Sequence, residues 1–159
     1  MFHYYQPTKI HFGAGQLNEL GHICRGYGKT CFLVTTPDAP LQPLYERVKK
    51  LLDAEGISVI HFDKVEPNPS VEIVEQGFAM LKEQPADFVL AVGGGSSIDT
   101  AKAIAFANGK ESIDWDHLFN EYSSPFAYYP SYSEKHLPLL SVPTTSGTGS
   151  QVTQAAVIT

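Results

Sequence analysis

The sequence predicts a doubly wound α/β domain, in which a mostly parallel sheet is covered by helices on both faces. Short apolar strands alternate with amphipathic helices along the chain, the clearest strand is an uninterrupted apolar run, and glycine-rich turns follow two strands. Alternation of this kind implies right-handed crossovers and a parallel sheet. Apolar runs are typical of strands that are buried on both faces. The 159 residues suffice for one domain and are too few for two.

Residues 30–35 (TCFLVT) predict the first buried strand, because most of them are β-branched or aromatic. The amphipathic helix that follows closes at Gly56, and residues 57–62 (ISVIHF) predict the second strand. The apolar stripe of this helix consists of Leu44, Val48, Leu51 and Leu52.

The second helix follows the loop EPNPS, where Ser70 is well placed as its N-cap. Residues 87–92 (DFVLAV) predict the strand buried on both faces, and a third helix begins in the glycine turn after it. The apolar positions of these two helices are Val71, Val74, Phe78 and Leu81, then Ile98, Ala101, Ile104 and Ala105.

The last third of the chain is less regular. Residues 108–136 show no clean period and predict a long connection with a short helix near Trp115 to Phe119. Residues 137–142 (LPLLSV) predict another buried strand, and residues 155–159 (AAVIT) are a candidate for a last one.

Composition and charge exclude several classes of protein. Hydrophobic residues make up 43% and charged residues 18%, which is a globular balance. The net charge of −6 argues against a nucleic-acid partner, and no apolar run approaches the roughly 20 residues of a membrane span. The N-terminus has no signal-peptide pattern. Because Cys24 and Cys31 cannot form a disulfide scaffold, we expect a cytoplasmic protein.

Residues 93–99 (GGGSSID) predict a pyrophosphate site. Glycines let the backbone approach a ligand, and the free N–H groups of a first helical turn favour an anion. Ser96 adds a hydroxyl donor, whereas the Asp99 carboxylate is expected to face a ribose hydroxyl or to cap backbone N–H groups. A tight turn that needs small residues only for packing is the alternative.

Common motifs fail at this turn and elsewhere. Both G-x-G-x-x-G and G-x-S-x-G require glycine where Ile98 stands, and residues 28–30 (GKT) lack the first glycine of a P-loop.

Residues 143–150 (PTTSGTGS) follow a strand and predict a wall of small donors beside a sugar–phosphate ligand, although a polar loop is the alternative. Neither segment holds a general base or nucleophile, so the residues alone predict nucleotide binding without chemistry.

Three segments, in matching order and spacing, resemble the iron-containing (group III) alcohol dehydrogenases: residues 65–69 (VEPNP), 93–105 (GGGSSIDTAKAIA) and 143–153 (PTTSGTGSQVT). Residues 12–15 (FGAG) fit as well. The resemblance implies that residues 1–159 are a Rossmann-like dinucleotide-binding domain. It further implies that this domain is the N-terminal half of an oxidoreductase that transfers hydride between an alcohol or aldehyde and NAD or NADP. The alternatives are a stand-alone nucleotide-binding module and a relative of glycerol dehydrogenases or dehydroquinate synthases, which share the fold.

The resemblance implies roles for individual residues. It assigns Gly94, Gly95 and Ser96 to the cofactor pyrophosphate, Asn68 to the adenosine half, and Gly149 to the place where a substrate approaches. Four threonines are assigned to the ribose and nicotinamide side: Thr144, Thr145, Thr148 and Thr153.

Two positions depart from the family. Thr36 stands where the family usually has Asp, whose carboxylate pairs with the adenosine ribose hydroxyls and repels a 2′-phosphate. NAD and NADP therefore both remain open, with Asp38 as a partial substitute. Gln151 stands where the family often has Glu, which removes a charge near the cleft.

The family's divalent metal, iron or zinc, polarises the substrate oxygen and is held by one Asp and three His of a helical C-terminal domain. The resemblance therefore implies that the metal ligands and the catalytic residues lie outside residues 1–159. The histidines show no i, i+4 pair and are expected at the surface or at edges: His3, His11, His22, His61, His117 and His136.

A domain without its partner exposes apolar surface. We expect a homo-oligomer or self-association, with residues 122–132 as the candidate surface.

Overall fold

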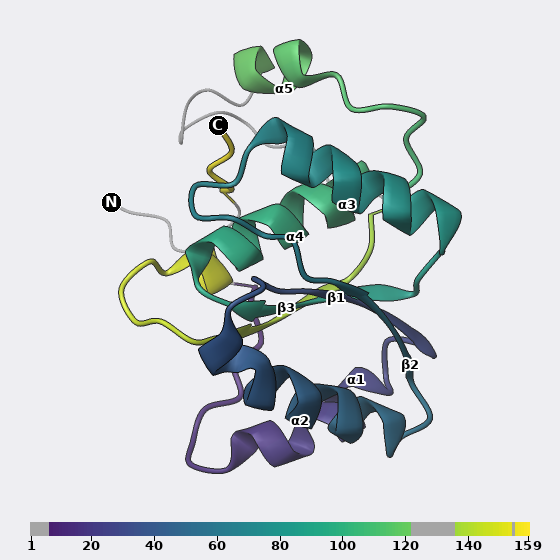
Figure 1. Cartoon of the computed structure of the whole chain (residues 1–159), viewed down its shortest axis with the longest axis vertical. Coiled ribbons are helices and arrows are strands. Elements are labelled where there is room, and N and C mark those ends of the chain that lie inside the picture. The colour runs from purple at the N-terminus through teal and green to yellow at the C-terminus, as the bar shows by residue number, and fades with distance from the viewer. Residues whose placement is uncertain (1–6, 122–135, 154) are drawn as a thin grey trace.

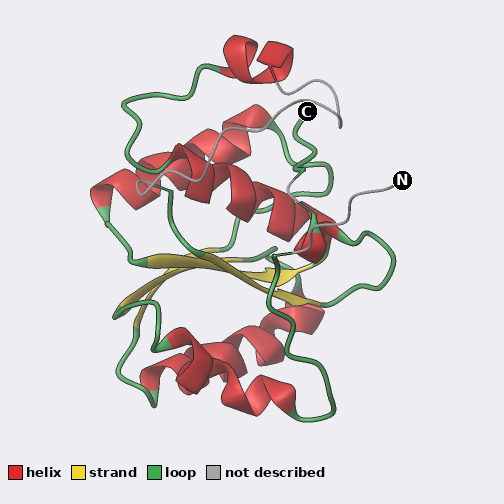
Figure 2. Cartoon of the chain, turned by 180° about the vertical axis from the view of Figure 1, so that it is seen from behind, coloured by secondary structure: helices red, strands yellow, loops and turns green. Residues whose placement is uncertain are grey.

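The computed structural model describes residues 7–121, 136–153 and 155–159. Four parallel strands form one sheet in the order β2-β1-β3-β4, with helices on both of its faces (Figures 1 and 2). The strands are β1 (Thr30–Val34), β2 (Ser58–Phe62), β3 (Phe88–Gly93) and β4 (Leu139–Pro143). The doubly wound α/β fold is therefore confirmed. Each strand begins at its predicted first residue or at most two residues after it.

The helices fall into two layers. In Figure 2 the sheet lies between them, and in Figure 1 α3 and α4 cover one face while α1 and α2 cover the other. The α-helices are α1 (Leu20–Cys24), α2 (Gln42–Asp53), α3 (Val71–Glu83), α4 (Gly95–Ala107) and α5 (Trp115–Glu121), and the 3-10 helices are η1 (Gln16–Glu19), η2 (Ala39–Leu41) and η3 (Ser150–Val152). The short helix predicted near Trp115 is α5.

The sheet buries a separate core on each face. Successive side chains of a strand point to opposite faces, so β1 and β3 contribute to both cores. On the face that α3 and α4 cover, the strand residues are Phe32, Val34, Phe62, Val89 and Ala91. On the face that α1 and α2 cover, they are Cys31, Leu33, Phe88, Leu90 and Val92. This explains why the central strands are apolar runs, whereas the edge strands β2 and β4 are partly exposed.

Local signals in the sequence set the ends of the helices. Pro43 lies in the first turn of α2, where its missing N–H is tolerated. Gly56 follows α2 with φ +70°, and its N–H donates to the Asp53 carbonyl at 2.8 Å. Ser70 stands at the N-cap of α3 in an extended conformation, as predicted, but its side chain makes no capping hydrogen bond.

Two parts of the chain differ from the prediction. The sequence pattern does not reveal η1 and α1, because a helix of five residues is too short to show a period. The candidate last strand, residues 155–159, is wrong, because these residues form no strand. Thr159 instead meets the loop before α3: its N–H donates to the Pro69 carbonyl, and its own carbonyl accepts from the Val71 N–H, both at 3.0 Å. Residues 122–132, the predicted self-association surface, lie outside the described residues.

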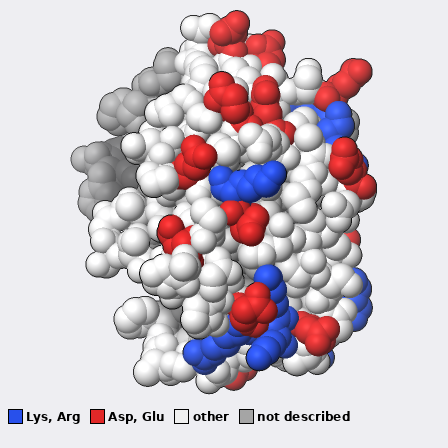
Figure 3. Space-filling view, viewed as in Figure 1, with Lys and Arg blue, Asp and Glu red and all other residues white. Residues whose placement is uncertain are grey.

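Charged side chains lie mainly on the outer faces of the helices. In the view of Figure 3, acidic side chains gather over α3 and α5, and most basic ones lie over the α2 layer. Some are paired at the surface, such as Lys49 with Glu46 at 2.9 Å, and exposed pairs of this kind contribute little to stability. Within the described ranges, no helix has the length and apolar character to cross a membrane.

Candidate functional site at the carboxyl edge of the sheet

The order of the strands determines where a ligand can enter. The chain leaves β1 toward β2 on one side of the sheet and leaves β3 toward β4 on the other, so β1 and β3 meet at a topological switch point. Ligands of open α/β sheets bind outside the carboxyl ends of the strands at this point. β3 ends in Gly93, which pairs in register with Pro143 at the end of β4. The two glycine-rich segments therefore begin side by side at the same edge.

The glycine turn brings backbone N–H groups to this edge. Gly93 has φ +155°, and a Cβ there would lie 2.3 Å from the Ser97 hydroxyl oxygen, so the position requires glycine. Gly94 is the N-cap of α4, which has no side-chain cap. The first N–H groups of α4 consequently lack a side-chain acceptor and point toward the carboxyl edge.

The second segment packs directly against the first. The Thr144 N–H donates to the Gly93 carbonyl at 2.9 Å. A Cβ on Gly94 would lie 3.3 Å from the Thr145 methyl carbon, and one on Gly95 would lie 3.1 Å from that of Thr148. Side chains at these two positions would push the threonines away. The missing Cβ atoms therefore let the two segments form one continuous surface.

A groove of about 450 Å³ runs along this surface. Its wall includes the first turns of α4, the loop after β4 and the loop before α3. The lining residues are Asn68, Pro69, Gly95, Ser96, Asp99, Thr148, Ser150, Thr153, Ala155 and Val157. Asn68 has φ +54°, a left-handed conformation that Asn tolerates better than most residues. Six residues predicted for the cofactor thus line one groove: Asn68, Gly95, Ser96, Asp99, Thr148 and Thr153.

Lys102 ties the wall of this groove together. Its ammonium group donates to the Ser150 hydroxyl at 3.0 Å, the Thr153 hydroxyl at 3.2 Å and the Ala155 carbonyl at 2.6 Å. The Asp99 carboxylate lies 3.6 Å from the same nitrogen, and both side chains are 13% exposed. Burial lowers the pKa of Lys102, and the Asp99 carboxylate opposes this shift.

The Asp99 carboxylate accepts hydrogen bonds from the loop after β4. The Ser150 hydroxyl donates to one of its oxygens, and the Val157 N–H donates to the other at 3.1 Å. Capping of backbone N–H groups was one of the two expectations for this residue, and the Val157 contact agrees with it. The charge of Asp99 is also balanced by Lys102, which the sequence prediction did not include in the site.

Thr36 lies apart from the groove, beyond the end of β1. Its hydroxyl donates to the Asp38 carboxylate at 2.8 Å and lies 2.9 Å from the Tyr45 hydroxyl. The predicted substrate-proximal residue, Gly149, is also absent from the groove lining; it has φ +65° and is the N-cap of η3. Sequence reasoning missed Lys102 and Tyr45, and it included Ser150 only as part of the donor wall 143–150. The i, i+3 spacing of Asp99 and Lys102 was the available signal for the first of these.

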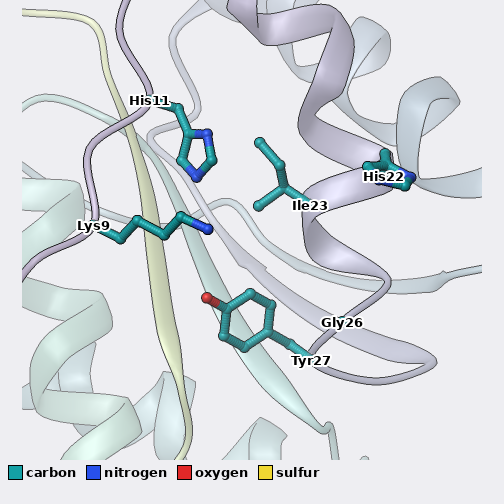
Figure 4. Close-up of a pocket in the computed structure, with 6 residues that line it drawn as sticks. All are labelled: Lys9, His11, His22, Ile23, Gly26 and Tyr27. Carbon is teal, nitrogen blue, oxygen red and sulfur yellow. The ribbon is translucent and has the colours of Figure 1, made fainter.

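Another cavity, of about 500 Å³, lies against α1. It is lined by Lys9, His11, His22, Ile23, Gly26 and Tyr27. Figure 4 shows the Lys9 ammonium and the Tyr27 hydroxyl turned toward one another, whereas His22 points away. None of the residues predicted for the cofactor lines it, so we place the candidate site at the glycine turns.

The described parts of the chain offer no group of three or more His, Cys, Asp or Glu side chains that could hold a metal ion. The donor set around the groove consists of hydroxyls, backbone N–H groups and one balanced Lys–Asp pair. This set suits an anion and hydroxylated rings rather than a divalent cation.

Comparison with known proteins identifies the relatives of this chain. Residues 7–159 match the family described as iron-containing alcohol dehydrogenase. A probable NADH-dependent butanol dehydrogenase of Bacillus subtilis is 38% identical over 99% of this chain and 38% of its own length, and a choline dehydrogenase of the same organism is likewise 38% identical, over 99% of this chain and 38% of its own length.

Solved structures agree with this match. An alcohol dehydrogenase from an archaeon of a Red Sea brine pool superposes with a TM-score of 0.83 at 33% identity, over 100% of this chain and 40% of its own length. An iron-containing alcohol dehydrogenase of Thermotoga maritima has a TM-score of 0.80 at 33% identity, over 96% of this chain and 40% of its own. The chain thus spans about two fifths of the length of the relatives that it matches.

Proposed function

This chain belongs to the iron-containing alcohol dehydrogenases, and from that premise we propose that it is the coenzyme-binding part of an NAD(P)-dependent alcohol dehydrogenase. The reaction is hydride transfer between a small alcohol or its aldehyde and the nicotinamide ring. Several relatives are named as NADH-dependent butanol dehydrogenases, which supports a nicotinamide coenzyme. The coenzyme supplies the hydride chemistry when bound; the residues of the two glycine segments bind and orient it.

The observation that carries this proposal is the contact between the two glycine segments at the N-terminus of α4. A Cβ on Gly94 or Gly95 would lie 3.3 or 3.1 Å from a threonine methyl carbon, so the two glycines let the threonine segment pack closely against the turn at the N-terminus of α4. We assign the diphosphate to Gly94, Gly95 and Ser96, because the uncapped N–H groups of α4 attract an anion.

The remaining residues of the site receive the sugars and the ring. We assign Asn68 to the adenosine half, because it lines the same groove as Ser96. The nicotinamide side is assigned to four threonines and its substrate to the neighbourhood of Gly149; the threonines are Thr144, Thr145, Thr148 and Thr153. We assign these residues to the coenzyme because they supply hydroxyls and backbone N–H groups; the described residues include no group of three or more possible metal ligands.

A charge placed at the N-terminus of α4 tests the proposal. The change Ser96→Asp puts a carboxylate where the diphosphate would bind, so NADH affinity should fall by at least about tenfold. The folded state should not weaken, because an acidic side chain in the first turn of a helix adds about 0.3–1 kcal/mol. Titration followed by nicotinamide fluorescence measures the affinity, and urea unfolding measures the stability.

The matched control is Ser58→Asp, which adds the same charge at the exposed start of β2, at the opposite edge of the sheet. NADH affinity should be unchanged in this variant. Equal affinities of the two variants would contradict the assignment of the diphosphate. Binding of NADH without any alcohol oxidation by the full-length protein would instead favour the stand-alone nucleotide-binding module.

Assembly and location belong to the same proposal. We propose a homo-oligomeric protein of the cytoplasm. Both cysteines are free, which is what a reducing compartment favours. Light scattering of the full-length protein at several concentrations measures the oligomeric state, and a monomer throughout would refute that part.

A further inference from the structure

The cavity against α1 brings together polar side chains from two separate segments of the chain. Lys9 and His11 precede the first helix, whereas Tyr27 follows the end of α1, and all three line the same space of about 500 Å³. Figure 4 shows the polar ends of these three side chains directed into that space, while Ile23 forms an apolar wall. A cavity of this volume lies within the range of small-molecule sites.

The three polar groups are hydrogen-bond donors. An ammonium, a phenol and an imidazole each carry at least one N–H or O–H group. Within the part of the chain that the structure describes, no hydrogen bond or ion pair joins the Lys9 ammonium, the His11 ring or the Tyr27 hydroxyl to another protein group. The Cys24 carbonyl at the end of α1 already accepts from the Tyr27 N–H at 2.9 Å. These donors are therefore available to a ligand.

The charge of this cavity is opposite to that of the whole chain. The net charge of the chain is −6, yet no carboxylate is among the residues that line the cavity. Two carboxylates of neighbouring elements have other partners. Glu55 is paired with the Arg25 guanidinium at 3.1 Å, and Asp87 accepts from the N–H groups of two backbone residues at 2.6 and 2.9 Å. The Lys9 charge therefore gives the cavity a positive potential, which attracts an anion.

Burial of apolar surface does not explain why polar side chains face this cavity. Ile10 lies between Lys9 and His11 and is 64% exposed, and the next residue but one, Phe12, is 96% exposed. Removal of apolar surface from water would favour the reverse arrangement, with Ile10 and Phe12 turned inward. The observed arrangement instead gives the cavity its donors, which is what a polar ligand requires.

We propose that the cavity against α1 binds a small organic anion through its carboxylate or phosphate group. The Lys9 ammonium supplies the opposite charge, and the His11 ring and the Tyr27 hydroxyl donate hydrogen bonds to the anionic oxygens. Ile23 and the ring of Tyr27 offer apolar surface to the remainder of the ligand. The cavity shares no lining residue with the groove at the glycine turns, so this site goes beyond the proposed function and does not rest on it.

Calorimetric titration with benzoate and with phenyl phosphate tests the site, because these probes carry the two anionic groups on the same ring. The titrations use the full-length protein with the change Ser96→Asp, whose carboxylate keeps a phosphate away from the glycine turn. At least one probe should bind, and Lys9→Met on this background should weaken its binding by at least about tenfold. Tyr27→Phe keeps the ring that packs 6.2 Å from that of Phe88 and loses only the hydroxyl, so it should weaken binding by about threefold to tenfold.

The matched control is Lys50→Met on the same background, which removes a positive charge from the exposed surface of α2. The affinity for both probes should be unchanged in this variant. A probe that binds more tightly than the other, and loses affinity only in the Lys9 and Tyr27 variants, supports the site and identifies the anionic group that it takes. Binding of neither probe, or equal affinities of the Lys9→Met and Lys50→Met variants, would overturn the inference and leave the proposed function standing.

Discussion

Replacement of Lys102 by methionine removes the cation that joins α4 to the loop after β4. Methionine keeps most of the length and apolar stem of lysine, so the change isolates the ammonium group. In the native protein this group donates to three oxygens, at 3.0, 3.2 and 2.6 Å, and lies 3.6 Å from Asp99. All three of its protons are therefore used within the wall of the groove.

The expected cost follows from burial. Removal of one partner of a buried ion pair costs about 3–5 kcal/mol when the other charge is left uncompensated. Here Asp99 keeps two donors, the Ser150 hydroxyl and the Val157 N–H. Desolvation also lowers the pKa of Lys102, so the charged form already carries a cost in the folded state. We therefore expect the free energy of unfolding to fall by about 2–3 kcal/mol.

Urea unfolding followed by circular dichroism measures this loss. The control is Lys49→Met, which breaks the pair with Glu46 on the surface of α2, where the two side chains are 31% and 57% exposed. That change should cost about 1 kcal/mol or less. Equal losses in the two variants would refute the view that Lys102 closes the groove wall.

Three further predictions concern the two cores and the turn. Burial holds the pKa of His61 below its ordinary value of 6.5, so as pH falls below about 6.5 the unfolded chain takes up the proton first and stability is lost. His61→Gln should therefore flatten the dependence of the urea midpoint on pH between pH 7 and 5. Parallel curves of urea midpoint against pH for the native protein and the variant would contradict this. Burial raises the pKa of Cys24 to about 12 and raises that of Cys31 as well. Neither thiol should therefore react with a disulfide reagent at pH 8 until the protein is unfolded. Rapid reaction of the native protein would contradict this prediction. The buried Ser97 hydroxyl has no hydrogen-bond partner among the described residues, so Ser97→Ala should keep the free energy of unfolding within about 0.5 kcal/mol of the native value. Thr100→Val loses a 2.8 Å hydrogen bond to the Ser96 carbonyl and should cost about 1 kcal/mol.

The elements with a clear period could be predicted from the sequence. β1 and β3 are apolar because they face two cores, and α3 and α4 show the stripes that cover one of them. The loop 155–159 could not be predicted, because an apolar run with β-branched residues is equally compatible with a strand and with an extended segment. Backbone bonds of Thr159 to Pro69 and Val71 decide between the two, and they join residues about ninety positions apart.

The glycine residues of the site were visible in the sequence, but their neighbours were not. Residues 28–30 (GKT), which resemble the end of a P-loop, illustrate the same limit at another glycine. A Cβ on Gly28 would lie 2.2 Å from the Asp87 side chain, whose carboxylate accepts from the N–H groups of Lys29 and Thr30 at 2.6 and 2.9 Å. Glycine is therefore needed there for a carboxylate cap that comes from a distant part of the chain.

For Thr36 the sequence indicated the position and not the bonding. Its hydroxyl is bonded to Asp38 and Tyr45, and Tyr45, although buried in α2, lies outside the apolar stripe that the sequence predicts for this helix. Lys102 was overlooked for a similar reason, because a lysine in a helix is ordinarily a solvated residue. Contacts between side chains of distant segments are set by the tertiary structure, which a single sequence does not display.

The separation of the two apolar cores by the sheet has a consequence for how this domain tolerates change. Substitutions that are far apart and share no neighbours add independently in their effects on folding. Val48 and Leu52 pack beneath the sheet with α1, whereas Val74 and Ile104 pack above it. Divergence among homologues can therefore rebuild the lower layer, one residue at a time, while the upper layer keeps α4 and its glycine turn in place.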